Sequence, residues 1–139
     1  MKPLPPLALF AFSVACGGGG PHLSNLRCRD ASQCTDAEDP LKLLLAVDFQ
    51  DDSKTLSAGA LELRVGGDTQ RAIALADAFA AQGIAKDAAR GTLAIDDDLV
   101  LDQLRNGQEV TVGFIATNGR REQSNEADMK FVVRVGAGP

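Results

Sequence analysis

The stretch Met129-Lys130-Phe131-Val132-Val133-Arg134-Val135 decides the fold class. Its apolar side chains at 129, 131, 133 and 135 alternate with Lys130, Val132 and Arg134, which is the period of a strand with one face turned to a core. The same period of two recurs at 43–49, 61–65 and 110–115. The chain therefore reads as a series of short, half-buried strands.

Turn signals separate these runs. Gly66-Gly67-Asp68 follows the strand at 61–65, and Asn106-Gly107 and Asn118-Gly119 flank a strand at 108–117. Glycine and asparagine accept the left-handed backbone conformations that tight turns need. Short strands with frequent turns, and no alternation with long helices, predict an antiparallel β-sandwich and disfavour a parallel α/β sheet.

The remaining segments complete the expected domain, which spans 21–135 and is followed by a frayed tail at 136–139. With them the count reaches about seven strands, which a sandwich requires. The expected elements are a first strand near 22–27, a strand at 69–76 with a short helical or irregular turn through 79–82, a strand at 92–95 leading into Asp96-Asp97-Asp98, and a helical turn at 99–104.

Length and composition limit the function classes. The 139 residues fit one domain, and 45% hydrophobic with 24% charged residues is an ordinary globular composition. The net charge of −5 disfavours nucleic acid as a partner, because phosphate binding depends on Lys and Arg. There is no Trp and no Tyr, which lowers the expectation of a sugar-binding surface.

The N-terminus has the pattern of an export signal over 1–15. Lys2 precedes a mostly apolar run that is long enough for a signal-peptide core and too short to span a bilayer. The run ends in Ser13-Val14-Ala15-Cys16, which resembles the lipobox of bacterial lipoproteins. The resemblance implies cleavage before Cys16, acylation of that cysteine and attachment to a membrane through the lipid.

Residues 16–20 are then expected to be a lipid-anchored, glycine-rich tether, because four glycines follow Cys16. In lipoproteins of this kind, an Asp after the cysteine often retains the protein at the inner membrane. Gly17 stands there instead, so the outer membrane is favoured if the host has one. The alternative is an ordinary secretory signal that releases an unanchored protein.

The cysteine count agrees with a lipid on Cys16. Three cysteines in an exported chain leave one thiol unpaired, and acylation of Cys16 would leave Cys28 and Cys34 as a disulfide pair. Such a short loop would stabilise the fold by roughly 2 kcal/mol. The competing interpretation is zinc, but the two thiols have only His22 as an imidazole to join them.

Three short segments resemble immunoglobulin-like or fibronectin-type-III-like modules of bacterial surface proteins. They are Pro21–Leu26, Val47–Asp52 and Ala116–Gly119 followed by Ser124-Asn125. The resemblance implies a single immunoglobulin-like sandwich used for display, adhesion or spacing. It names no ligand.

Two acidic clusters are candidate sites. Asp48, Asp51 and Asp52 could supply oxygen ligands to calcium, although a solvated turn with Lys54 as counter-charge explains them more simply. Asp96, Asp97 and Asp98 could cap a turn starting at Leu99. Paired carboxylates could also perform glycoside hydrolysis, but no sequence feature indicates a cleft.

No catalytic set is evident, because His22 is the single histidine and stands beside the glycine run. The sequence therefore favours a non-enzymatic, lipid-anchored envelope protein that binds, adheres or displays. The alternative is a periplasmic or secreted enzyme, or an enzyme inhibitor, on the same fold. A third reading is an assembly partner that pairs through the edge of the strand at 129–135. No cofactor is expected, and calcium at Asp48, Asp51 and Asp52 is the one candidate that the sequence offers.

Overall fold

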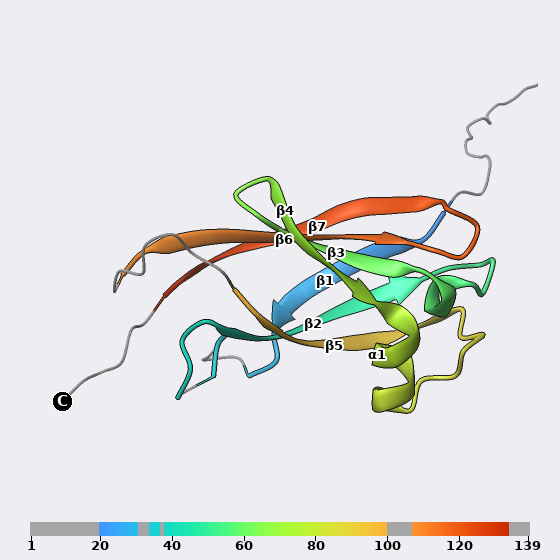
Figure 1. The fold of residues 1–139 in the computed structure, drawn as a ribbon, viewed down its shortest axis with the longest axis horizontal. Coiled ribbons are helices and arrows are strands. Elements are labelled where there is room, and N and C mark those ends of the chain that lie inside the picture. The colour runs from blue at the N-terminus through green and yellow to red at the C-terminus, as the bar shows by residue number, and fades with distance from the viewer. Residues whose placement is uncertain (1–19, 31–33, 37, 100–106, 134–139) are drawn as a thin grey trace, which may run out of the picture.

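The computed structural model describes residues 20–30, 34–36, 38–99 and 107–133. Within them seven strands form two antiparallel sheets that pack face to face, which confirms the predicted all-β sandwich (Figure 1). The elements in chain order are β1 (His22–Cys28), β2 (Lys42–Gln50), η1 (Leu56–Ala58), β3 (Ala60–Val65), β4 (Asp68–Ala74), α1 (Leu75–Gln82), β5 (Arg90–Asp98), β6 (Glu109–Thr117) and β7 (Gln123–Val132).

The sheets have the strand orders β1-β2-β5 and β4-β3-β6-β7. Consecutive strands therefore pair as hairpins at β1–β2, β3–β4 and β6–β7, while β2 pairs with β5 and β3 with β6 across the sequence. The expected strands at 43–49, 61–65 and 110–115 are confirmed as the centres of β2, β3 and β6.

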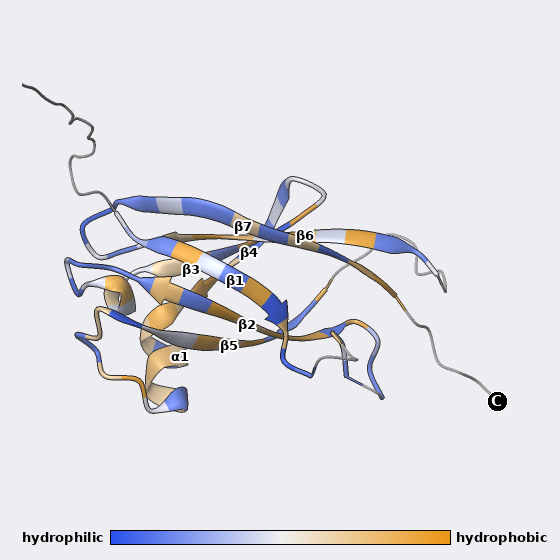
Figure 2. Cartoon of the chain, turned by 180° about the vertical axis from the view of Figure 1, so that it is seen from behind, coloured by the Kyte–Doolittle hydropathy of each residue, from blue (hydrophilic) through white to orange (hydrophobic). Residues whose placement is uncertain are grey.

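The core lies between the sheets and follows the period of two seen in the sequence. In β2 the four residues of one parity, from Leu43 to Phe49, are at most 3% exposed. Hydrophobic and hydrophilic bands alternate along the strands in Figure 2, as expected for sheets with one face in the core. The facing sheet contributes Leu61, Leu63, Val110, Val112, Phe114 and Phe131.

The segment after β4 differs from the expected strand at 69–76. β4 ends at Ala74, and the helix α1 begins at Leu75, four residues before the predicted turn. Leu75 and Phe79 lie one helical turn apart and both are buried in the core, so helical spacing takes precedence over alternation. The helix ends at Gln82, and Gly83, which has a positive φ of 69°, caps it in the left-handed conformation.

The strand expected at 92–95 continues through Asp96, Asp97 and Asp98, and their predicted role as caps for a turn at Leu99 stays a prediction, because that turn lies outside the described residues. All three belong to β5, where they pair with Leu44, Leu43 and Lys42 of β2. The strand continues because β2 extends opposite it and supplies the backbone partners, and Leu99 still donates its N–H to Leu41 O at 2.7 Å. The expected helical turn from Leu99 to Leu104 lies outside the described residues after Leu99.

The last strand begins earlier than the alternation predicts. β7 starts at Gln123, and its first four residues are polar and either exposed or half-buried, so no apolar period marks them. They are held as a strand by pairing with β6, with Thr117 opposite Gln123. The expected end of this strand beyond Val133 lies outside the described residues.

The predicted disulfide between Cys28 and Cys34 is present, with Cα atoms 4.5 Å apart. It joins the end of β1 to the segment that leads into β2, and Leu44 N–H donates to Cys34 O at 2.7 Å. The signal segment 1–15, Cys16 and the tether up to residue 19 lie outside the described residues, as does the tail at 136–139.

Candidate binding site

A pocket of about 400 Å³ opens on the side of the sandwich where β5 of one sheet approaches β4 and α1 of the other. We call it the lateral pocket. Its size falls in the range of small-molecule sites. It is lined by Arg29, Leu61, Ile73, Leu75, Ala78, Ala81, Gln82, Leu93, Ala94, Ile95 and Asp96.

The interior of the lateral pocket is apolar because residues of the hydrophobic core line it. Leu61, Leu75, Leu93 and Ile95 are each at most 3% exposed and belong to the hydrophobic core. The outer wall is α1, whose pocket-facing residues include the small side chains Ala78 and Ala81. Alanines leave space that larger side chains would fill.

The helix side of the pocket mouth is fixed by Gln82, the last residue of α1. Its side-chain Nε2 donates to Ala94 O at 2.7 Å, and its Oε1 accepts from Ala94 N–H at 2.8 Å. The amide thus bonds both backbone groups that Ala94 of β5 presents to it. These two hydrogen bonds tie the helix to β5, which is an edge strand of the three-stranded sheet.

The opposite side of the mouth carries an ion pair. Arg29 follows the disulfide cysteine Cys28, and its guanidinium donates to Ile95 O at 2.8 Å and to the Asp96 carboxylate. Its Nε also donates to Leu45 O at 3.3 Å. The cation is therefore held over β2 and β5, at the rim of an otherwise apolar pocket.

The lateral pocket combines an apolar interior with three polar side chains at its rim, those of Arg29, Gln82 and Asp96. Among the described residues that line the pocket there is no hydroxyl, thiol or imidazole that could act as a nucleophile or general base. Its two charged groups are paired with each other. An apolar group enclosed by the walls, with a polar end near the Arg29–Asp96 ion pair, matches what the pocket offers.

The predicted calcium residues do not face one another. Asp48 lies in β2, half-exposed, where it accepts from Asn25 Nδ2 at 3.1 Å, Arg27 NH1 at 3.1 Å and Thr92 Oγ1 at 2.8 Å. The hydrogen bonds from Asn25 and Thr92, followed by that from Arg27, lower the pKa of Asp48 below its ordinary value. Asp52 is exposed on the following turn.

Asp51 turns inward and is 1% exposed. Its carboxylate accepts hydrogen bonds from the Ser53 hydroxyl, from the backbone N–H groups of Ser53 and Thr55, and from Asn118 Nδ2 at 3.1 Å. Asn118 is 2% exposed, and its Oδ1 accepts from the backbone of Arg120 and Glu122. We call the Asp51–Asn118 bond the loop clamp, because it joins the loop after β2 to the β6–β7 turn.

The calcium hypothesis stays a prediction, now with competing partners for its carboxylates. In the part of the chain that the structure describes, no three side chains of His, Cys, Asp or Glu are grouped as a metal site would need. Asp48 and Asp51 have hydrogen-bond partners within the protein. His22 is exposed at the start of β1.

The edge of β7 is the predicted pairing surface, and one of its side chains, that of Asn125, bonds the backbone of β1. Asn125 Oδ1 accepts from Leu23 N–H at 2.9 Å, and Asn125 Nδ2 donates to Leu23 O at 2.9 Å. The amide therefore links β7 to β1 of the other sheet. Val132, near the end of β7, is 42% exposed and is the one large hydrophobic residue that is exposed among those described.

Sequence reasoning missed Arg29, Gln82, Asn118 and Asn125 as organising residues. Each is a polar side chain in or beside a loop or strand whose partner is distant in the sequence, by up to 102 positions. The alanine-rich stretch at 72–81 was the available signal for the pocket, because small side chains leave space.

Comparison with known proteins gives no match to any protein family, curated protein or solved structure. Within the described ranges, every helix falls short of the length and apolarity needed to cross a bilayer.

Proposed function

We propose that this chain is an exported, lipid-anchored binding module, with Cys16 as the acylated residue and the lateral pocket as the ligand site. The observation that carries the binding role is the pocket itself, with apolar walls and polar rim groups that are bonded to one another or to backbone. The anchor is supported by the lipobox-like sequence before Cys16 and by the pairing of the other two cysteines.

The strand order supports an immunoglobulin-like assignment. Numbered along the chain, the sheets β1-β2-β5 and β4-β3-β6-β7 correspond to strands A-B-E opposite C′-C-F-G of that architecture. Modules of this shape expose loops at both ends and leave their lateral sides open to partners. This fits a protein whose task is to hold a ligand or another protein at a surface.

The anchor is tested by intact-mass spectrometry of the protein purified from the membranes of its own cells. A chain that begins at Cys16 and carries acyl mass, with a gain of two hydrogens on reduction of Cys28–Cys34, is the expected result. An unacylated chain in the soluble fraction would overturn the anchor and favour the secreted enzyme or inhibitor.

The pocket is tested with 1-anilinonaphthalene-8-sulfonate, a fluorescent apolar anion. We expect saturable binding to the folded protein, and loss of binding in Ala78→Phe, because the larger ring would fill the mouth. The matched control is Ala85→Phe, since Ala85 is exposed in the loop after α1 and does not line the pocket. Equal binding by both variants and the wild type would show that the probe binds elsewhere.

A further inference from the structure

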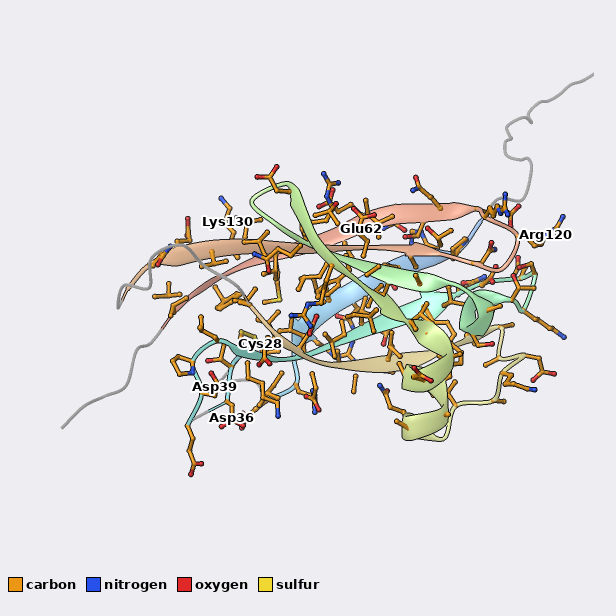
Figure 3. All side chains as sticks on the ribbon, in the orientation of Figure 1. Cys28, Asp36, Asp39, Glu62, Arg120 and Lys130 are labelled. Carbon is orange, nitrogen blue, oxygen red and sulfur yellow. A yellow bond between two sulfur atoms is a disulfide. The ribbon has the colours of Figure 1, made fainter. Side chains whose placement is uncertain are left out.

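The sandwich has two ends that differ in charge. The proximal end is formed by Gly20, where the described chain begins, and by the loops at 51–59, 84–90 and 118–122. The distal end is formed by the described residues 29–30, 34–36 and 38–42 between β1 and β2, the end of β5 at 96–98, the start of β6 at 107–109 and the end of β7 at 130–133 (Figure 1). Arg120 lies at one extremity of the molecule in Figure 3, and Asp36 and Asp39 lie near the other.

Gly20 lies directly against the proximal turn. A Cβ at Gly20 would lie 2.6 Å from Glu122 Cβ and 3.2 Å from Gln123 O, so the chain enters in contact with the β6–β7 turn. Gly119 of that turn in turn donates its N–H to Thr55 O at 2.8 Å. The chain entrance and the proximal loops are therefore one continuous surface.

The charges separate along this axis. The proximal end has five cations and four carboxylates, one of which is the buried Asp51, whereas the described residues of the distal end have three cations and eight carboxylates. The proximal cations are all exposed, and they are Lys54, Lys86, Arg90, Arg120 and Arg121.

Two of these cations occupy an unfavourable backbone conformation. Lys54 has a φ of 61° and Arg121 a φ of 65°, in the left-handed region that favours glycine. Each closes a turn that begins on a residue of the loop clamp: Lys54 N–H donates to Asp51 O, and Arg121 N–H donates to Asn118 O, both at 3.0 Å.

The loop clamp thus sets two cation-bearing turns side by side. Glycine at either position would be less strained, so stability alone gives no reason for a long cation there. Strain of this kind is a reason to look for a function of the side chain.

We infer that the proximal end lies against the anionic lipid surface to which the chain is anchored, with the acidic distal end pointing away. This inference rests on the proposed acylation of Cys16. Four Cα–Cα steps separate Cys16 from Gly20, so the anchor would hold Gly20 within about 15 Å of the lipid. Anionic lipids attract Lys and Arg over about one Debye length. A tether of this length brings the proximal cations close to that range.

The geometry makes the orientation selective. A lipid anchor alone would allow the domain to tumble on its tether. An anionic surface would attract the proximal cations and repel the carboxylates of the distal end, so both ends favour the same orientation. Each cation near such a surface is worth roughly fivefold in the equilibrium between the apposed and free orientations.

The test uses the lipoprotein purified from its own membranes and reconstituted into phosphatidylcholine vesicles with or without phosphatidylglycerol. Amide hydrogen exchange is measured over 52–55 and 119–122. We expect exchange there to be slower, by roughly fivefold or more, when phosphatidylglycerol is present, and the difference to disappear at high salt.

The informative variant is Lys54→Gly with Arg121→Gly. Because glycine accepts both backbone conformations, the variant is expected to have a melting temperature at least as high as that of the wild type, and to lose the lipid-dependent protection. The matched control is Lys42→Gln with Lys130→Gln, which removes the same charge away from the proximal end and should keep the protection (Lys130 is labelled in Figure 3).

Two outcomes would overturn the inference, and they are distinguishable. If the intact mass includes the acyl group but the exchange is the same in both kinds of vesicle, the orientation is wrong and the anchor remains. The same conclusion follows if the glycine variant keeps the lipid-dependent protection. If the mass shows no acyl group, the anchor fails and the inference fails with it.

Discussion

Asn125 of β7 binds both backbone groups of Leu23 in β1, accepting from its N–H and donating to its C=O, each at 2.9 Å. Gln82 does the same for Ala94 of β5 on the other side of the molecule. β1 and β5 are the two edges of the three-stranded sheet. Each edge is thus tied to the four-stranded half of the sandwich by one primary amide that substitutes for a neighbouring strand.

This arrangement bears on how the protein avoids unwanted pairing. An open strand edge is a template for another chain, and side chains that occupy its backbone groups block that template. The side-chain amides of Asn125 and Gln82 bond to Leu23 and Ala94, which lie within the edge strands β1 and β5. They also join the sheets at their lateral sides, where the backbone hydrogen bonds of the ladders do not reach.

We expect Asn125→Ala to lower the free energy of unfolding by about 1–2 kcal/mol, because two hydrogen bonds to Leu23 are lost at a half-exposed site. Urea unfolding measures the change. Gln123→Ala on the same strand is the control, since Gln123 is exposed and should change the stability by less than about 0.5 kcal/mol. Equal losses in the two variants would mean that the link to Leu23 does not contribute.

Gln82→Glu tests the other amide by removing its donor alone. At neutral pH a carboxylate could still accept from Ala94 N–H, but its second oxygen would face Ala94 O and repel it. We expect exchange of the Ala94 amide hydrogen to speed up roughly fivefold, which corresponds to about 1 kcal/mol. Acidification that protonates the new side chain should restore the wild-type protection of this amide, measured as the ratio of the intrinsic to the observed exchange rate at each pH. Wild-type exchange at neutral pH would contradict the proposed bonding.

Asp51→Ala is expected to cost about 2–3 kcal/mol, because Asn118 and the Ser53 and Thr55 backbone would lose a buried acceptor. The neighbouring Asp52→Ala is a matched control, since Asp52 is exposed. The free energy of unfolding of both variants, measured by chemical denaturation, distinguishes a buried loop clamp from a pair of solvated carboxylates. A comparable loss in Asp52→Ala would argue that the two residues act together.

The same region gives a direct test of calcium. We expect the melting temperature to be unchanged between excess calcium and a chelator, because the Asp51 oxygens are already occupied by donors from the protein. A ligand that binds the folded state alone would raise the melting temperature as its concentration rises. A calcium-dependent rise that Asp48→Asn abolishes would support the metal site instead.

Asp48 should contribute to the pH dependence of stability. Its pKa is lowered in the folded protein by hydrogen bonds from Asn25, Thr92 and Arg27, so the folded state binds this proton less readily than the unfolded chain. Its contribution is fully present above the unfolded-state pKa of about 3.9 and is lost as the pH falls through the lower folded value. Asp48→Asn should therefore flatten the decline of stability below about pH 4, as measured by urea unfolding across that range. An unchanged slope of stability against pH would mean that the hydrogen bonds to Asp48 do not stabilise its charged form.

Sequence alone determined the fold class, the main strands and the disulfide. Alternation of apolar residues at 43–49, 61–65 and 110–115 is a local property, fixed by which side chains a pleated strand can bury. The turn at Gly66-Gly67 is also local, because both glycines have a positive φ. The pairing of Cys28 with Cys34 was predicted from the odd number of cysteines together with the lipid that the lipobox-like sequence implies on Cys16.

Tertiary structure decided the rest. Leu75 became helical because its spacing from Phe79 let both enter the core, and Asp96–Asp98 became a strand because β2 extended beside them. The lateral pocket, the loop clamp and the two amide links join residues 12 to 102 positions apart. A polar side chain in the sequence gives no sign of which distant backbone group it will bind, because that depends on the packing of the two sheets.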